Sequence, residues 1–190
     1  MSLACNALIG ASLAIATVVL PLSAAPQTQP VLELSDSVAL RAPQSLPLQQ
    51  LGRSSFYVSI FHVYDAELWA PATGFSWDDP FRLKLTYARK IEAGQLVTAS
   101  VKEMARIFDG EAEDFETLRS SLAACFRDVK KGDVIEGVSE SRNAAVFFFN
   151  GNETCRLTLP EASYQFFSIW LNEGSRSPKQ MRRLLGQKKR

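Results

Sequence analysis

The side chains that could carry out chemistry are concentrated in one short stretch, "IFHVYDAELW" at residues 60–69. It holds the single histidine of the chain, His62, together with Tyr64 and two carboxylates, Asp65 and Glu67. The density of aromatic and β-branched residues predicts a β-strand, in which Asp65 and Glu67 point to the same side. Carboxylates that work as an acid and base pair must face each other across a cleft. We therefore interpret Asp65 and Glu67 as part of a polar sheet face.

His62 and Tyr64 point to the other side of this predicted strand, together with the apolar residues Ala66 and Leu68. A polar side chain in apolar surroundings needs a hydrogen-bond partner. The two residues are therefore either satisfied groups of the core or the polar positions of an apolar pocket. The sequence leaves both interpretations open.

Composition and charge exclude several classes of function. The 190-residue chain has 21 basic and 20 acidic residues, a net charge of +1, which does not favour nucleic acid as a partner. One histidine and three widely spaced cysteines argue against a metal site. The chain has neither a glycine-rich phosphate loop nor a GxSxG motif. We expect no metal, no cofactor and no nucleic-acid partner.

The N-terminal segment has the pattern of a targeting signal. Residues 1–32 contain no charged side chain, and the apolar run from Ala7 to Leu22 leads into the small residues of "PLSAAP". This pattern predicts a signal peptide over residues 1–25, and the alternative is a retained membrane anchor. We expect a periplasmic, monomeric protein with no membrane span after cleavage.

The rest of the chain has the length of one compact domain. We assign residues 26–50 to an N-terminal leader with a short strand near "VLELSDSVAL", and residues 51–187 to the domain. Residues 188–190 form a basic tail, which is explained by a solvated end after a last helix.

Two periodicities divide the predicted domain into strands and helices. Apolar, aromatic and alternating patterns predict four strands, at 56–70, 81–88, 144–149 and 153–159. Apolar residues at helical spacing and capping signals predict four helices, around 97–108, around 115–126, after Pro160 and from Ser177. The sequence thus predicts an α+β fold, an antiparallel sheet that carries helices on one face.

The last two predicted strands form a hairpin, because Asn150-Gly151 is a strong signal for a two-residue turn. The register that follows places Phe149 opposite Asn152 and Val146 opposite Cys155.

Cys125 and Cys155 are the cysteines that remain after the predicted cleavage. In an oxidising compartment such a pair favours a disulfide. Cys125 lies on the apolar stripe of the helix around 115–126, and Cys155 lies in a strand that this helix could cover. If Cys155 faces the helices, the two form a bridge; if it faces the other side, each is a small apolar core residue.

Six segments, taken in order, resemble the bacterial, exported members of the chalcone isomerase-like family. They are "FHVYDAELW" (61–69), "DPFRLKLTYARKIEAGQL" (79–96), "SVKEM" (100–104), "FRDVKKGD" (126–133), "FFFNGN" (147–152) and "FFSIWLNEGSRSPKQMRRLLG" (166–186). The resemblance implies an open-faced β-sandwich. In this fold a large antiparallel sheet carries a layer of helices, and an apolar cleft between the two binds ligands.

The family contains plant enzymes that close chalcones to flavanones and related proteins that bind fatty acids. The resemblance implies that Arg53 and Tyr64 face the cleft, with tyrosine at position 64 as in the binding proteins. A further tyrosine of the enzymes falls near Leu96, which has no hydroxyl.

The leading hypothesis is a non-catalytic domain whose cleft binds a small amphipathic ligand such as a fatty acid. Its acidic end would lie near Arg53 and Tyr64, with His62 as a further polar position. One alternative is an isomerase or intramolecular lyase acting on a chalcone-like phenolic or enone substrate, with Arg53 stabilising an oxyanion. Another is an envelope protein with a structural or interaction role.

Overall fold

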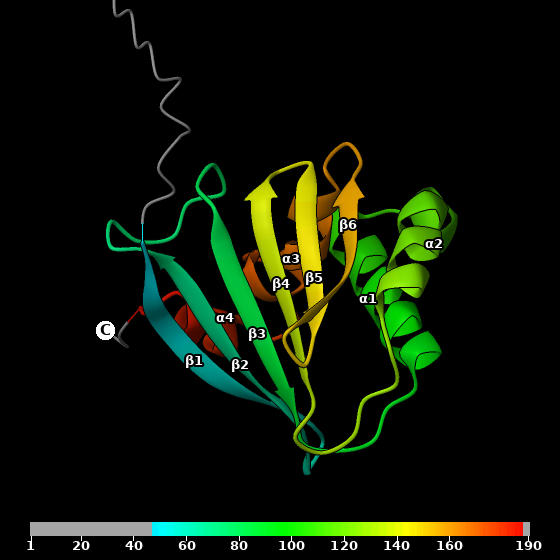
Figure 1. Cartoon of the computed structure of the whole chain (residues 1–190), viewed down its shortest axis with the longest axis horizontal. Helices are drawn as coiled ribbons and strands as arrows, with labels where there is room; N and C mark the ends of the chain where they lie inside the picture. Colours follow the sequence, from blue (N-terminus) through cyan, green and yellow to red (C-terminus); the bar gives the residue numbers. More distant parts are fainter. Residues whose placement is uncertain (1–46, 188–190) are drawn as a thin grey trace, which may run out of the picture. The chain divides into compact units, whose positions relative to one another are not determined.

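The computed structural model describes residues 47–187. They form a six-stranded antiparallel sheet in which each strand pairs with the next along the chain (Figure 1). The strands are β1 (Leu48–Val58), β2 (Phe61–Pro71), β3 (Phe81–Tyr87), β4 (Val134–Ser141), β5 (Ala144–Phe149) and β6 (Asn152–Thr158).

Helices cover one face of this sheet. They are α1 (Ala93–Phe108), the 3₁₀ turn η1 (Ala112–Phe115), α2 (Glu116–Cys125), α3 (Ala162–Leu171) and α4 (Pro178–Leu184). Helix α3 lies over β4, β5 and β6, and α4 lies against β1 (Figure 1). Helix α1 packs on α3 and α2, and α2 reaches the edge strand β6. The predicted α+β fold, with helices on one face of an antiparallel sheet, is confirmed.

Strand β3 shows how alternation gives the sheet two different faces. The side chains that face the helices are all buried: Phe81, Leu83, Leu85 and Tyr87. On the other face Lys84 Nζ lies 3.6 Å from Glu67 Oε2, and Arg82 Nε lies 3.6 Å from Glu136 Oε1. A period of two residues therefore separates an apolar inner face from a charged outer face.

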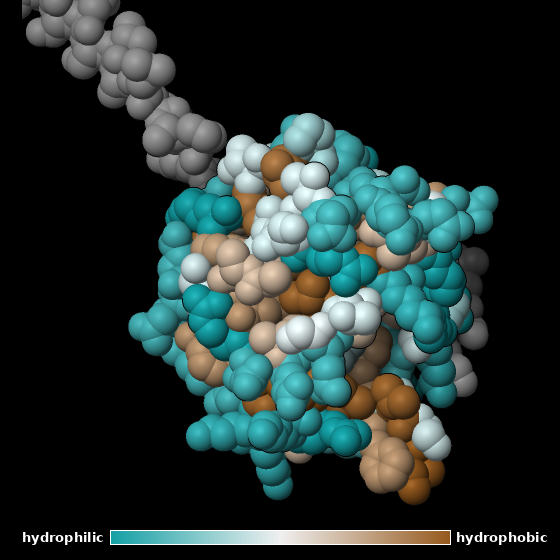
Figure 2. All heavy atoms as spheres, turned by 90° about the vertical axis from the view of Figure 1, so that its right-hand side faces the viewer, coloured by the Kyte–Doolittle hydropathy of each residue, from teal (hydrophilic) through white to brown (hydrophobic). Residues whose placement is uncertain are grey.

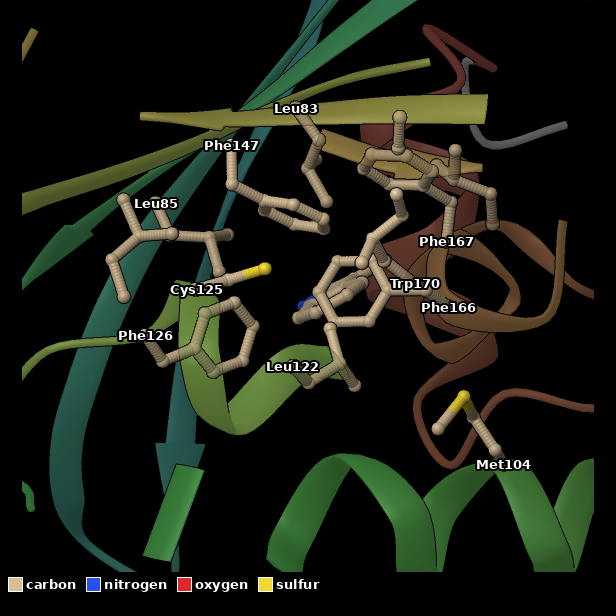
Figure 3. Close-up of a cluster of buried hydrophobic side chains, with 14 of the residues drawn as sticks. Leu83, Leu85, Met104, Leu122, Cys125, Phe126, Phe147, Phe166, Phe167 and Trp170 are labelled. Atoms are coloured by element: carbon tan, nitrogen blue, oxygen red, sulfur yellow. The ribbon is translucent and has the colours of Figure 1, made fainter. Parts of the chain in front are cut away.

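The core is centred on α3, which is apolar around most of its circumference. Phe166, Phe167 and Trp170 turn toward the sheet and are buried against Phe147 and its neighbours (Figure 3). Phe167 lies over Gly137, where an added Cβ would stand only 2.8 Å from the ring. The missing side chain at Gly137 thus lets the helix approach the sheet closely.

The prediction of one strand over residues 56–70 is wrong, because the chain turns at Ser59 and Ile60 between β1 and β2. Ser59 adopts the left-handed conformation, with φ of 55°. The turn contains no glycine or proline and is flanked by apolar residues, so the sequence pattern does not show it. Strand β4 was not predicted either, although "VIEGVSES" alternates in burial.

The hairpin of β5 and β6 forms at the predicted turn, and Phe149 pairs with Asn152 as predicted. The prediction that Val146 faces Cys155 is wrong, because Cys155 pairs with Phe147. The register shifts between Phe147 and the next residue of β5, a β-bulge that the turn sequence does not reveal.

Several predictions concern residues outside the described range 47–187. They are the signal peptide over 1–25, the short strand of the leader and the basic tail over 188–190. The leader range 26–50 overlaps the described chain at the first residues of β1. Within residues 47–187 we find no helix with both the length and the apolar character needed to cross a membrane.

A disulfide joins Cys125, the last residue of α2, to Cys155 in β6. The two Cα atoms are 5.1 Å apart, a separation that a disulfide spans readily. Cys155 faces the helices because it pairs with Phe147, whose ring lies in the core. The bridge therefore fastens α2 to the edge of the sheet.

Replacing both Cys125 and Cys155 by alanine should lower the free energy of unfolding by about 3–4 kcal/mol, because the bridge closes a loop of about 30 residues in the unfolded chain. Denaturant titration of the oxidised protein and the double variant measures the difference, and the reduced protein should unfold like the variant. Alkylation of both thiols in unreduced, denatured protein would contradict the bridge.

Candidate functional site

A cleft lies between the inner face of the sheet and helices α1 and α3. Its main cavity has a volume of about 460 Å³, within the range of about 300–1,000 Å³ that is usual for ligand pockets. Tyr64 and Tyr87 line it from the sheet, Leu96 and Ala99 line it from α1, and Trp170 lines it from α3. The cleft is thus built from elements that are far apart in the sequence.

The cleft continues inward as a narrower recess of about 120 Å³. The main cavity and the recess share the side chains of Tyr64, Tyr87, Leu96, Ala99, Ile169 and Trp170. The inner end is lined by the apolar side chains of Leu85, Phe126, Ile135 and Phe166, and by Ser100, whose hydroxyl donates to the Leu96 carbonyl at 2.9 Å. Figure 3 shows Phe126, Phe166 and Trp170 among the buried side chains of the core. The recess therefore suits the apolar end of a ligand.

One hydrogen bond joins the two walls of the cleft. Trp170 Nε1 donates to the Tyr64 hydroxyl at 2.9 Å. The Tyr64 ring is stacked on Phe56, with 4.9 Å between ring centroids, and meets Tyr87 edge-on at 5.7 Å. Because the Tyr64 oxygen accepts from Trp170, its own proton is left to donate to a ligand.

Both tyrosine hydroxyls stay neutral at physiological pH. Burial raises the pKa of Tyr64 far above its ordinary value, and the hydrogen bond from Trp170 offsets this only in part. Burial likewise raises the pKa of Tyr87, with a further contribution from Tyr64. The two groups can donate hydrogen bonds, but they are not poised to act as bases.

Charged side chains gather at the mouth of the cleft, around the buried Glu103 of α1. Glu103 Oε2 lies 2.9 Å from Arg176 Nη2 and accepts from Arg106 Nε at 3.1 Å. Burial acts to raise the pKa of Glu103, but hydrogen bonds and charges from Arg106 and Arg176 outweigh it and hold the pKa below its usual value. This cluster ties α1 to the connection between α3 and α4.

Two cationic side chains line the mouth of the cleft, those of Lys102 and Arg176. Arg176 is held by Glu103, whereas Lys102 is exposed and makes no ion pair within residues 47–187. The inner recess has no charged residue in its lining. With these two cations and the one carboxylate of Glu103, the mouth has a net positive charge, while the inner end is mainly apolar.

The structure places Tyr64 in the cleft and Arg53 outside it. Arg53 is exposed and pairs with Glu67 across β1 and β2. Directly paired residues of antiparallel strands share a face, and Glu67 is on the outer face with Lys84. Arg53 therefore borders a polar surface hollow with Asp65 and not the apolar cleft, in contrast to the expectation from the family resemblance.

His62 also lies away from the cleft. The pairing of β1 with β2 shifts register at Tyr57, which leaves Val63 as an extra residue in β2. This bulge breaks the alternation that was expected to place His62 beside Tyr64. His62 is partly exposed, and its Nε2 lies 3.1 Å from Asp65 Oδ1.

Sequence reasoning missed Trp170, Lys102 and Arg176 as cleft residues. Trp170 is buried with the core aromatic residues and at the same time lines the cleft. The sequence contains a signal for the cleft-lining side of α1, because Leu96, Ala99 and Glu103 follow helical spacing beside the main apolar stripe. Arg176 lies in a connection without periodicity, so no sequence signal indicates it.

Comparison with known proteins identifies the fold. No protein-family model and no curated protein matches this sequence. A solved structure of a fatty-acid binding protein from Arabidopsis thaliana is similar, with a TM-score of 0.59 and 11% sequence identity. The match covers 76% of this chain and 91% of that chain. The chain therefore has a chalcone isomerase-like fold, as the sequence resemblance predicted, while its bacterial and exported character stays a prediction.

Trp170→Ala should lower the free energy of unfolding by about 3–5 kcal/mol, because it empties a large buried volume between α3 and the sheet. Denaturant titration measures this change. A loss below about 1 kcal/mol would show that this ring contributes little to the core.

Tyr64→Phe keeps the ring but removes the acceptor of the Trp170 N–H. It should lower the free energy of unfolding by about 1 kcal/mol, which denaturant titration also measures.

The pH dependence of stability should change in Glu103→Gln. Because the pKa of Glu103 is lowered in the folded protein, its carboxylate stabilises the fold above the ordinary value of 4.5, and this contribution is lost as the pH falls through the lowered pKa. The stability difference between the wild type and Glu103→Gln should thus be largest near neutral pH and shrink in acid. Glu113→Gln, at an exposed position, is the control. A difference that stays constant with pH would contradict this role of Glu103.

Proposed function

We propose that the cleft binds a small amphipathic molecule with an apolar chain and an acidic head group, such as a fatty acid. The observation that carries the proposal is the polarity of the cleft, which is apolar at its inner end and cationic at its mouth. The similarity in fold to a fatty-acid binding protein supports it.

The apolar chain would enter between Tyr64 and Tyr87 on the sheet and Ala99 on α1. Ala99 is small, so it leaves the passage open to the recess. Beyond it the chain would contact Phe126 and Phe166, where burial of apolar surface is favourable.

The acidic head would stay at the mouth, where water and cations stabilise its charge. Lys102 supplies an ammonium group that has no ion pair within the described residues. Arg176 supplies a guanidinium that is already paired with Glu103 on one side. The Tyr64 hydroxyl adds a neutral donor farther inside. A negative group placed deeper than Tyr64 would meet a lining without any charged residue and would lose its hydration without a compensating charge.

Binding without catalysis is the activity that these groups support. The raised pKa values of Tyr64 and Tyr87 keep both hydroxyls protonated, so neither is suited to remove a proton from a substrate. Leu96 lies in the cleft with no hydroxyl to position a water molecule.

We include export to an oxidising compartment, the periplasm, in this proposal. The predicted signal peptide supports it. The bond between Cys125 and Cys155 also supports it, because disulfides persist in oxidising compartments and are rare in the cytosol.

Oleate is a suitable probe. Delipidated protein should bind it, and oleate should displace a fluorescent fatty acid from the cleft. Ala99→Trp should weaken binding at least about tenfold, because the indole fills the passage to the recess. The matched control is Ala123→Trp, at an exposed position of α2 that does not line the cleft. Both variants should keep the circular dichroism of the wild type. Equal binding of oleate by Ala99→Trp and the wild type would contradict the proposal.

The position of the head group can be tested separately. Lys102→Glu should weaken oleate binding about tenfold, because it replaces an attraction at the mouth by a repulsion. Oleyl alcohol, which has the same chain and no charge, should bind both proteins equally. A similar loss for both probes would mean that Lys102 acts on the shape of the cleft and not on charge.

A further inference from the structure

The turn between β1 and β2 exposes a cluster of large apolar side chains. We call residues 57–61 the β1–β2 tip. Its exposed fractions are 56% for Tyr57, 68% for Val58, 82% for Ile60 and 58% for Phe61, and no other large apolar side chain within residues 47–187 is as exposed. Figure 2 shows apolar residues protruding at the lower end of the domain, where Figure 1 places this turn. Such exposure is costly in water and indicates an interaction surface.

The tip is continuous with the mouth of the cleft. Tyr57 and Val58 line the main cavity with one side and are exposed on the other. A surface that covers the tip would therefore also lie against the entrance to the cleft. The tip thus borders the cleft mouth through Tyr57 and Val58, whereas Ile60 and Phe61 do not line the cavity.

Basic side chains surround the tip. The connection from β3 to α1 carries Arg89 and Lys90, and the connection from α2 to β4 carries Lys130 and Lys131, all four exposed. These connections lie at the same end of the sheet as the tip (Figure 1), and Arg89 Cζ lies 5.8 Å from the centre of the Phe61 ring. The geometry thus combines apolar side chains with a cationic border.

Three acidic side chains lie in these two connections, and two of them, Asp128 and Asp133, are engaged in local hydrogen bonds, while Glu92 is exposed at the start of α1. Asp128 accepts from the backbone N–H of Ala93 at 2.9 Å. Asp133 accepts from the backbone N–H of Lys130 at 2.8 Å and from Asn150 at 3.1 Å, and these bonds lower its pKa. The four exposed basic heads therefore outnumber the one exposed carboxylate, Glu92, that remains for an external partner.

From these observations we infer that the β1–β2 tip docks on the surface of an anionic lipid bilayer. A protruding turn of aliphatic and aromatic side chains can enter the interfacial layer of a bilayer, where tyrosine is favoured. The surrounding lysines and arginines would meet anionic headgroups. The pattern fits a bilayer better than a protein partner, since the apolar groups form a convex point and not a flat patch.

Docking would place the cleft mouth against the bilayer, so that an acyl chain could move between the two without crossing water. This exchange role rests on the proposed lipid-binding function. The docking itself rests on the tip and its basic border alone.

The test uses flotation with vesicles of phosphatidylcholine, with and without phosphatidylglycerol. The wild-type protein should float with the vesicles that contain phosphatidylglycerol and should bind pure phosphatidylcholine at least about tenfold more weakly. Replacing Ile60 and Phe61 together by aspartate should lower binding about a hundredfold, because two inserted side chains are lost and charge is added. The matched control, Ile60→Leu with Phe61→Trp, should bind like the wild type, and its tryptophan emission should shift to shorter wavelength on docking.

Oleate binding in the absence of vesicles separates the two proposals. The aspartate variant should bind oleate like the wild type, because Ile60 and Phe61 do not line the cleft. Vesicle binding without oleate binding would sustain docking and refute the lipid-binding function. Failure of the folded wild type to float with anionic vesicles would overturn docking, as would equal flotation of the aspartate variant. A wild-type dimer that becomes monomeric in the aspartate variant would assign the tip to self-association instead and overturn the inference.

Discussion

The packing of helix α3 on the sheet is the contact on which the rest of the domain depends. Phe167 fits over Gly137, and Phe166 meets Phe147 edge-on with 5.0 Å between the ring centroids. Helix α1 then packs on α3 and α2, and not flat on β2 and β3. The space that remains above Tyr64 is the cleft, so the cavity is a consequence of where α3 holds the helical layer.

Specific polar and covalent links keep this space open and defined. The Trp170–Tyr64 hydrogen bond joins the two walls, and the Glu103–Arg176 ion pair holds the mouth. The disulfide fixes α2, against which α1 rests. Fixed walls of this kind lower the cost of ordering the protein in the ligand binding proposed above.

The irregular pairing of β1 with β2 connects the cleft to the surface of the domain. The bulge at Val63 leaves Tyr64 facing inward and turns His62 toward Asp65 on the outer face. Beyond the bulge the two strands continue to an apolar turn that shares side chains with the cleft mouth. One local feature of the backbone thus separates the polar outer face from the entrance of the cleft.

The sequence by itself determined the α+β class, the helices around Val101 and Phe166, and the hairpin at residues 150–151, because periodicity and turn chemistry are local properties. The family resemblance indicated Tyr64 as a cleft residue, and only the tertiary structure decided which other polar residues meet it there. Arg53 and His62 carry suitable chemistry, yet strand pairing and a bulge direct both to the outer face. Lys102 and Arg176 reach the mouth through the packing of α1 and an irregular connection, which no local pattern encodes. Strand register and helix packing are set by contacts between distant segments, and a single sequence read locally does not contain them.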